Sequence, residues 1–236
     1  MGDRRTPPSA SPALTMGTAL EQVCCGQRLL LLPERALFWQ ERKMLVVADP
    51  HFGKAQLFRE RGVPVPRGTT ADDLARLSRL IDVLRPRRLL FLGDLTHGPL
   101  EDTVAFHRQI TPWRQRYRDI EFFLVRGNHD RRNGPPSAAF RFDRITTQMV
   151  EGPFVFNHQP QRLDARYSIA GHLHPAVVMT GRGALKATLP CFCFGPQGAL
   201  LPAFGGFTGN HAIRPLPDDR VFVIADHAVL ELPETA

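Results

Sequence analysis

The chain has 236 residues, 43% apolar and 22% charged, a composition that excludes a mainly disordered protein and allows a sizeable hydrophobic core. The net charge is +7, and all basic residues except Lys43, Lys54 and Lys186 are arginines, which favours an anionic or phosphorylated partner, although solvated arginines would give the same charge. No apolar run reaches the roughly 18–20 residues of a membrane helix, and the four cysteines match no disulfide or zinc pattern, so a reduced, cytoplasmic protein without a membrane partner is expected.

The first 20 residues are rich in Pro, Ser and Thr and are predicted to form a flexible tail. Met16 offers an alternative start of the chain. No later stretch has the composition of a long linker, and no repeat occurs. Residues 21–236 are therefore predicted to form a single domain.

Two helices are predicted in the first half of the chain. Thr70 is expected to be the N-cap of the first, with Asp72 and Asp73 in its first turn and Pro86 beyond its end. Its apolar stripe consists of Leu74, Leu77, Leu80, Ile81 and Leu84. The second helix is predicted over residues 101–110, with Pro112 limiting it.

Short apolar stretches that alternate with these helices predict parallel strands in a layered α/β sheet. The predicted strands cover residues 44–48, 89–92, 122–125, 154–156 and 167–170. The last third has strands without clear helices, at residues 185–189, 221–224 and 229–232, and a Gly/Pro-rich stretch over 195–217. This part predicts a second, more antiparallel sheet that packs into the same domain.

Side chains that suit metal ions follow all five of the first predicted strands. In α/β sheets, ligands bind at the carboxyl ends of the strands, so these side chains are expected to gather at one edge. The donors are carboxylate, amide and imidazole without thiolate, which favours manganese, iron or zinc. Asp94, after Gly93, is the expected bridge between two cations. The set is Asp49, His51, Asp94, Asn128, His129, His158, His172 and His174.

Each of these motifs also has an ordinary explanation when taken alone. An Asp-x-His tripeptide is usually surface polarity, Gly-Asp is common in turns, and Asn128 with Asp130 could form a turn. His172 and His174 are more specific, because side chains two residues apart on an extended segment point the same way. The five motifs occur in order, each at the end of a predicted strand, and together they favour a metal centre.

As a set, the motifs resemble the signature of calcineurin-like metallophosphoesterases. A closer resemblance, to the ligase-associated DNA damage response endonuclease family of bacteria, rests on the segments 48–54, 63–70, 171–176, 189–192 and 201–205. Pro50 departs from the leucine expected in that family. Since proline favours an extended residue before it, Asp49 is expected to be extended and still able to bind a metal.

The resemblance implies a four-layer αββα fold, with two packed mixed sheets flanked by helices. It also implies two divalent ions, manganese first, with iron or zinc as alternatives. His129 would contact the substrate phosphate or protonate the leaving oxygen, and Asp130 would orient His129. The first metal would take Asp49, His51, Asp94 and His174, and the second would take Asp94, Asn128, His158 and His172. Two cations roughly 3.5–4 Å apart can clamp a phosphate while a shared hydroxide attacks phosphorus in line.

Other polar residues near the motifs are weaker candidates. Arg126, Arg131 and Arg132 flank the predicted catalytic loop and could hold substrate phosphates, or they could be solvated. His97 is expected to cap a turn, with support of the site as the alternative. Lys54 is a further candidate for the border of the site.

The predicted function is a metal-dependent phosphodiesterase or nuclease linked to DNA repair. The resemblance implies DNA as the substrate and an ATP-dependent DNA ligase and a helicase of the same repair system as partners. A nucleotide or small-molecule phosphomonoesterase or pyrophosphatase is the first alternative, because the metal motifs do not determine which phosphate ester is hydrolysed. A non-catalytic scaffold for repair partners is the second, but no expected ligand is missing. The sequence shows no interleaved aromatic and basic motif for base stacking.

Overall fold

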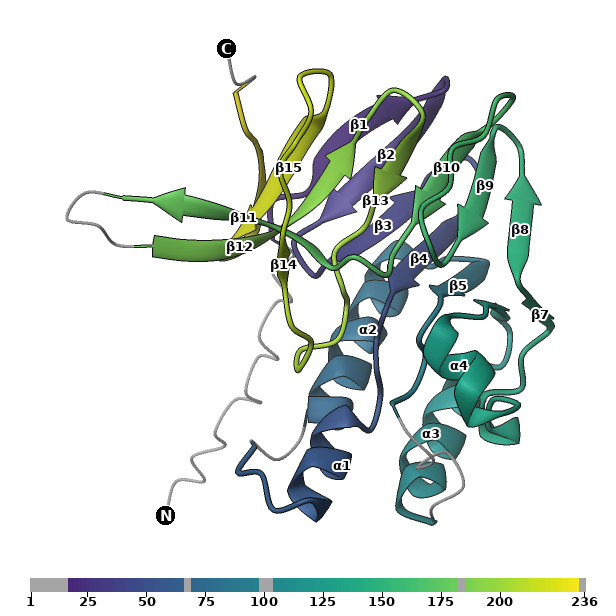
Figure 1. The fold of residues 1–236 in the computed structure, drawn as a ribbon. Coiled ribbons are helices and arrows are strands. Elements are labelled where there is room, and N and C mark those ends of the chain that lie inside the picture. Colours follow the sequence, from purple (N-terminus) through teal and green to yellow (C-terminus); the bar gives the residue numbers. More distant parts are fainter. Residues whose placement is uncertain (1–16, 66–68, 98–103, 182–185, 234–236) are drawn as a thin grey trace, which may run out of the picture.

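The computed structural model describes residues 17–65, 69–97, 104–181 and 186–233 (Figure 1). Most of the expected N-terminal tail, residues 1–16, lies outside these ranges. Thr18 already pairs with Ala228 near the C-terminus. Among the described residues, no helix combines the length and apolar character needed to cross a bilayer.

The first sheet has seven strands, in the order β1-β2-β3-β4-β5-β6-β7. They are β1 (Leu20–Cys24), β2 (Gln27–Leu32), β3 (Ala36–Trp39), β4 (Met44–Ala48), β5 (Arg88–Leu92), β6 (Glu121–Val125) and β7 (Arg144–Thr146). Strands β4 to β6 are parallel, as predicted, and β7, which was not predicted, continues the parallel order, while β1 to β4 pair antiparallel. Strand β4 is buried along its whole length, which explains its continuous apolar sequence.

The second sheet is built from the C-terminal half of the chain, and most of its pairings are antiparallel, as predicted. Its strands are β8 (Gln148–Glu151), β9 (Phe154–Asn157), β10 (Tyr167–Ala170), β11 (Pro175–Thr180), β12 (Lys186–Phe194), β13 (Gly198–Leu200), β14 (His211–Ala212), β15 (Arg220–Ala225) and β16 (Ala228–Glu231). The parallel pairs β9–β10 and β10–β13 matter most here, because residues that follow β9 and β10 enter the site.

The helices gather in the lower half of the molecule in Figure 1. They are α1 (Lys54–Glu60), α2 (Thr69–Leu84), α3 (Val104–Arg116) and α4 (Asn128–Asn133), with a short 3-10 helix, η2 (Ala138–Phe140). Leu77 of α2 and Ile110 of α3 belong to a buried cluster with Val47 and Phe91 of the first sheet. These two helices therefore cover one face of that sheet.

The opposite face of the first sheet packs against the second sheet. Their shared core includes Trp39, Val46 and Leu90 from the first sheet and Phe156 and Phe192 from the second. The outer face of the second sheet buries a smaller cluster around Cys191 and Val223. The α/β class with two packed mixed sheets is thus confirmed.

Two helix boundaries differ from the prediction. Thr70 is not an N-cap: α2 begins at Thr69, and the Thr70 hydroxyl accepts a hydrogen bond of 3.0 Å from the amide of Gly53. Helix α3 continues past Pro112 to Arg116, while residues 101–103 lie outside the described ranges. Pro112 is exposed, as is Arg108 one turn earlier, so the backbone carbonyl that loses its helical donor lies on the solvent face.

Candidate metal centre

The proposed site lies where parallel strands of both sheets end. In the first sheet, Ala48 pairs with Leu92 and Leu92 with Val125, which aligns the ends of β4, β5 and β6. In the second sheet, Ala170 pairs with Asn157. A hydrogen bond of 2.7 Å from the His172 amide to the Asp49 carboxylate joins the two edges. The polar residues that follow these strands are brought together in one place.

Two compact groups of donor atoms occupy this place. Within each group, one ligand atom per residue lies within 4.8 Å of the others. The groups are Asp49, His51 and His174, and Asp94, His158 and His172. Asn128 adds its amide oxygen to the second group, 2.9 Å from Nε2 of His158. The sequence resemblance assigns the members of each group to one expected metal ion, and Asp94 to both.

Asp94 is a member of the second group and also faces the first. Its Oδ2 is 3.5 Å from Nε2 of His158, in the second group, and 4.0 Å from Nε2 of His51, in the first. Its Oδ1 accepts a hydrogen bond of 2.9 Å from the amide of His129. One carboxylate oxygen is therefore fixed by the backbone, and the other is directed between the groups.

The residues present fit divalent cations. Oδ1 of Asp49 and Nδ1 of His51 are buried and have no hydrogen-bond partner among the described residues. Each such atom costs about 1–3 kcal/mol when nothing satisfies it. Carboxylate oxygen and neutral imidazole are also the donors that manganese, iron and zinc accept. A cation would remove the cost at Asp49 and use the donor set that the fold assembles.

Glycines before the motifs leave space for ligands from neighbouring strands. A Cβ atom on Gly93 would overlap the ring of His158, and one on Gly127 would overlap the carboxylate of Asp94. Gly93 also has φ of +81°, which glycine adopts without strain. Glycine is thus needed at both positions for steric reasons.

The ligand loops hold strained backbone. Positive φ values at residues other than glycine are costly, by about 1–3 kcal/mol each, and they concentrate at functional sites. They occur at Asp49 (50°), His51 (46°), Asp94 (47°), His172 (67°) and His174 (48°). The expectation that Pro50 makes Asp49 extended is therefore wrong: the preference imposed by Pro50 yields to the turn that lets the His51 amide bond the carbonyl of Asp94, at 3.0 Å.

Burial keeps two of the candidate ligands uncharged. It lowers the pKa of His51 to about 2, with a further decrease from the charge of Lys54. Burial also lowers the pKa of His158 to about 4, although the neighbouring Asp49 raises it. Neutral imidazole is the form that binds metals, so both side chains are ready for ligation near neutral pH.

These shifts predict that the protein without metal becomes less stable in mild acid. In the unfolded chain, histidine takes up a proton near its ordinary pKa of about 6.5, whereas folded His51 and His158 do not. Their contribution to the free energy of unfolding is complete above this pH and is lost as the pH falls toward about 4. Each adds a slope of about 1.4 kcal/mol per pH unit.

Urea unfolding of chelator-treated wild type and a His51→Gln variant, across this pH range, measures the effect. Burial raises the pKa values of Asp94 and Asp130, and these carboxyls act in the opposite sense. Their contribution largely cancels in the difference between the two proteins. The variant should show the smaller slope, and equal slopes would contradict the assignment for His51.

His129 lies beside the two groups and belongs to neither. Its Nε2 is 4.0 Å from Oδ2 of Asp94, and its side chain is 32% exposed, so a substrate can reach it. Asp130 is buried, and its two oxygens accept hydrogen bonds from the amides of Leu95 (2.8 Å) and Gly127 (2.7 Å). These bonds fix the backbone of the loop that carries His129.

The three predicted phosphate-binding arginines lie in different environments. Arg126 donates to the carbonyls of Asp130 (2.8 Å) and Gly134 (3.0 Å), which makes it a support of the loop. Arg131 and Arg132 are exposed on α4. Burial is the main cause of the lowered pKa of His158, and the charge of Arg131 adds to it.

His97 is closer to the site than the sequence suggested. Its ring centroid is 4.8 Å from that of His129 and 5.5 Å from that of His51. Nδ1 of His97 is buried without a hydrogen-bond partner among the described residues, and burial lowers the pKa of His97 to about 4. The only sign of this in the sequence was that His97 follows the candidate ligand Asp94 by three residues.

Asp73 fastens a distant loop beside the site. Its carboxylate accepts from the Gly206 amide at 3.0 Å and is 2.9 Å from the guanidinium of Arg76. The same loop supplies the carbonyl of Gly209, which lies 3.0 Å from Nδ1 of His174. The sequence predicted Asp73 only as a first-turn residue, because nothing local signals a partner 133 residues away.

Comparisons with known proteins place this architecture in a family. The family model for calcineurin-like phosphoesterases matches residues 42–168, which is more than half of the chain. The chain therefore belongs to the calcineurin-like phosphoesterase family. A search of curated proteins finds no match.

Among solved structures, the chain is similar to the nuclease MPE of Pseudomonas putida. The two are 36% identical, with a TM-score of 0.79, and the match covers 91% of this chain and all of that chain. The phosphoesterase Yfce of E. coli also matches, at 12% identity and a TM-score of 0.42, over 81% of this chain and 99% of that chain.

Proposed function

We propose that the protein hydrolyses phosphodiester bonds at a centre of two divalent metal ions, with DNA as the substrate. The observation that carries this proposal is the position of Asp94 between two groups of carboxylate and imidazole donors, next to a partly exposed histidine that belongs to neither. Similarity to the Pseudomonas putida nuclease supports the choice of a diester.

In this proposal the protein's own residues divide the work. Asp49, His51, Asp94 and His174 would hold one ion, and Asp94, Asn128, His158 and His172 the other. When bound, the ions would clamp the phosphate and activate water for the attack. His129 would contact the phosphate or donate a proton to the leaving oxygen, and Asp130 would hold the loop that carries it. Manganese is the proposed metal because it accepts imidazole ligands more readily than magnesium, which prefers oxygen ligands.

We also propose that the protein acts in DNA repair, with an ATP-dependent DNA ligase and a helicase as partners. This role and these partners rest on the sequence resemblance to the ligase-associated endonucleases. A non-catalytic scaffold is less favoured, because the donor groups are complete and the spare histidine is present.

A substrate panel tests the proposed reaction. Manganese-loaded protein should hydrolyse a bis-aryl phosphate diester faster than the matching monoester, and it should cleave DNA. Excess EDTA should abolish both activities. A preference for the monoester would instead favour a phosphomonoesterase, and activity that survives EDTA would contradict the metal-dependent reaction.

A further inference from the structure

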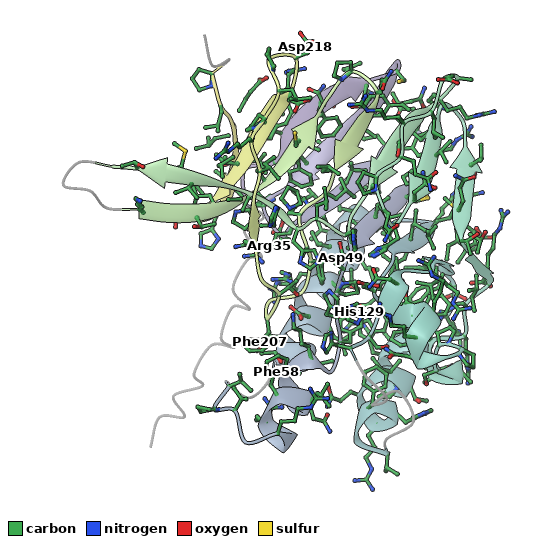
Figure 2. All side chains as sticks on the ribbon, viewed as in Figure 1. Arg35, Asp49, Phe58, His129, Phe207 and Asp218 are labelled. Carbon is green, nitrogen blue, oxygen red and sulfur yellow. The ribbon has the colours of Figure 1, made fainter. Side chains whose placement is uncertain are left out.

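Two phenylalanines meet outside the hydrophobic core, close to the proposed metal centre. Phe58 comes from α1 and Phe207 from the loop after Ala203, and their ring centroids are 5.7 Å apart at 78°. Both side chains are half-buried, and neither belongs to the three apolar clusters found in the described part of the chain. Figure 2 shows them side by side, below and to the left of His129 in that view.

A row of rings connects this pair to the candidate catalytic residue. The centroid of Phe58 is 6.4 Å from that of His97, which is in turn 4.8 Å from that of His129. One side chain, His97, therefore separates the aromatic pair from the histidine that we propose acts on the scissile phosphate.

The loop that carries Phe207 is held at both ends of a short segment. The amide of Gly206 bonds the carboxylate of Asp73 on α2, and the carbonyl of Gly209 lies 3.0 Å from Nδ1 of His174. The position of Phe207 is thus tied both to a helix of the core and to a candidate metal ligand. Such anchoring lowers the entropy cost of presenting the ring to a ligand.

Helix α1 adds positive charge on either side of Phe58. Lys54 and Phe58 of α1 and Arg61, the residue that caps the C-terminus of α1, follow at intervals of four and three residues, which places them on one face of the helix. Phe58 lies beside His97, with ring centroids 6.4 Å apart, so this face is directed toward the site.

No interleaved aromatic and basic motif for base stacking was expected from the sequence, but the fold brings such residues together. The pattern exists at helical spacing, and Phe207 completes it from a segment far along the chain. Aromatic side chains that stack with bases, flanked by cations that contact the backbone, are the usual elements of nucleic-acid grooves.

We propose that Phe58 and Phe207 form a subsite for the flat base attached to the scissile phosphodiester, with Lys54 and Arg61 contacting flanking phosphates. This proposal rests on the proposed phosphodiesterase function. It adds that the enzyme recognises a base of its substrate. If the pair served only to pack α1 against the loop, its loss would affect all substrates equally.

Kinetics with a shared leaving group separate these two roles. Manganese-loaded enzyme is given methyl p-nitrophenyl phosphate and the 3′- and 5′-p-nitrophenyl phosphates of thymidine, which differ only in the nucleoside. Wild type should have the higher kcat/KM on at least one nucleoside ester. In Phe58→Leu and Phe207→Leu, which keep apolar volume but lose the ring, this preference should fall about 5-fold or more.

In both variants the loss of kcat/KM on the methyl ester, which carries no base, should be much smaller than the loss on the nucleoside esters. Phe123→Leu is the matched control, because Phe123 is a half-buried ring of β6 that packs on the core between the sheets. The nucleoside preference of this variant should equal that of wild type. A wild type without nucleoside preference, or variants that keep it, would overturn the subsite.

Binding gives a second readout that does not depend on turnover. A dinucleotide with 2-aminopurine beside a methylene-phosphonate linkage, which cannot be cleaved, should lose fluorescence on binding to wild type, because the base stacks. Phe58→Leu should weaken this quenching, and Arg61→Gln should reduce the salt dependence of oligonucleotide binding by about one charge. Unchanged quenching would contradict the proposal. If wild type hydrolysed none of the aryl esters, the proposed function would fail, and this binding measurement would still decide on the subsite.

Discussion

An Asp94→Asn variant should lose both metal ions and nearly all activity. The carboxylate lies 3.5 Å from His158 and 4.0 Å from His51, so its charge serves both donor groups. Loss of a residue that merely supports a metal ligand typically costs about 10–100-fold, and removal of a shared ligand should exceed this, at about 1,000-fold or more in turnover. Elemental analysis and hydrolysis of a bis-aryl phosphate measure the two losses.

The fold of this variant should persist, because the strands beneath the site are held by apolar side chains. Asp119→Asn is the matched control, since this aspartate is 93% exposed and precedes β6 rather than following it. The control should keep metals and activity, with circular dichroism unchanged in both proteins. An Asp94→Asn protein that holds two metals and turns over near the wild-type rate would remove Asp94 from its bridging position.

A His129→Ala variant should keep both metals and lose turnover. His129 belongs to neither donor group, and its partly exposed ring lies 4.0 Å from Asp94. A positioned general acid contributes about 10²–10⁴-fold, and a lost contact to developing charge on phosphate costs a similar factor. His227→Ala is the control, because His227 is exposed in the turn before β16.

The choice of leaving group separates the two roles of His129. A deoxyribose alkoxide needs a proton to leave, whereas a nitrophenolate does not. If His129 is the acid, the deficit should be much larger for DNA than for the nitrophenyl diester. Equal deficits would assign His129 to phosphate binding, and no deficit on either substrate would exclude it from the site.

Local sequence was sufficient for the strands that position the site. Strands β4, β5 and β6 are runs of apolar residues that end in glycine or in polar residues, so both their extent and their parallel order could be predicted. Strands β1 to β3 were not predicted, although Leu29 and Leu31 of β2 are fully buried. These strands form antiparallel hairpins that pack against the second sheet, and no local sequence pattern predicts that packing.

The candidate ligands could be named from the sequence because each one follows a predicted strand within a few residues. The side chains that surround these ligands could not be predicted, since they come from segments that are far apart in the sequence and meet only in the folded chain. Asp73 reaches Gly206 from α2, and Phe58 meets Phe207 from a separate segment. Asp49 was expected to be extended but has φ of 50°, because a tertiary hydrogen bond outweighs the local preference imposed by Pro50.

Manganese titration of the chelator-treated protein, with bound metal and diester hydrolysis followed together, tests the two-metal centre most directly. Two donor groups that share Asp94 predict that two ions bind per chain and that activity appears only as both sites fill. Binding of two ions with full activity restored by the second is the expected result. Full hydrolysis of the diester by protein without bound metal, or with a single ion per chain, would contradict it.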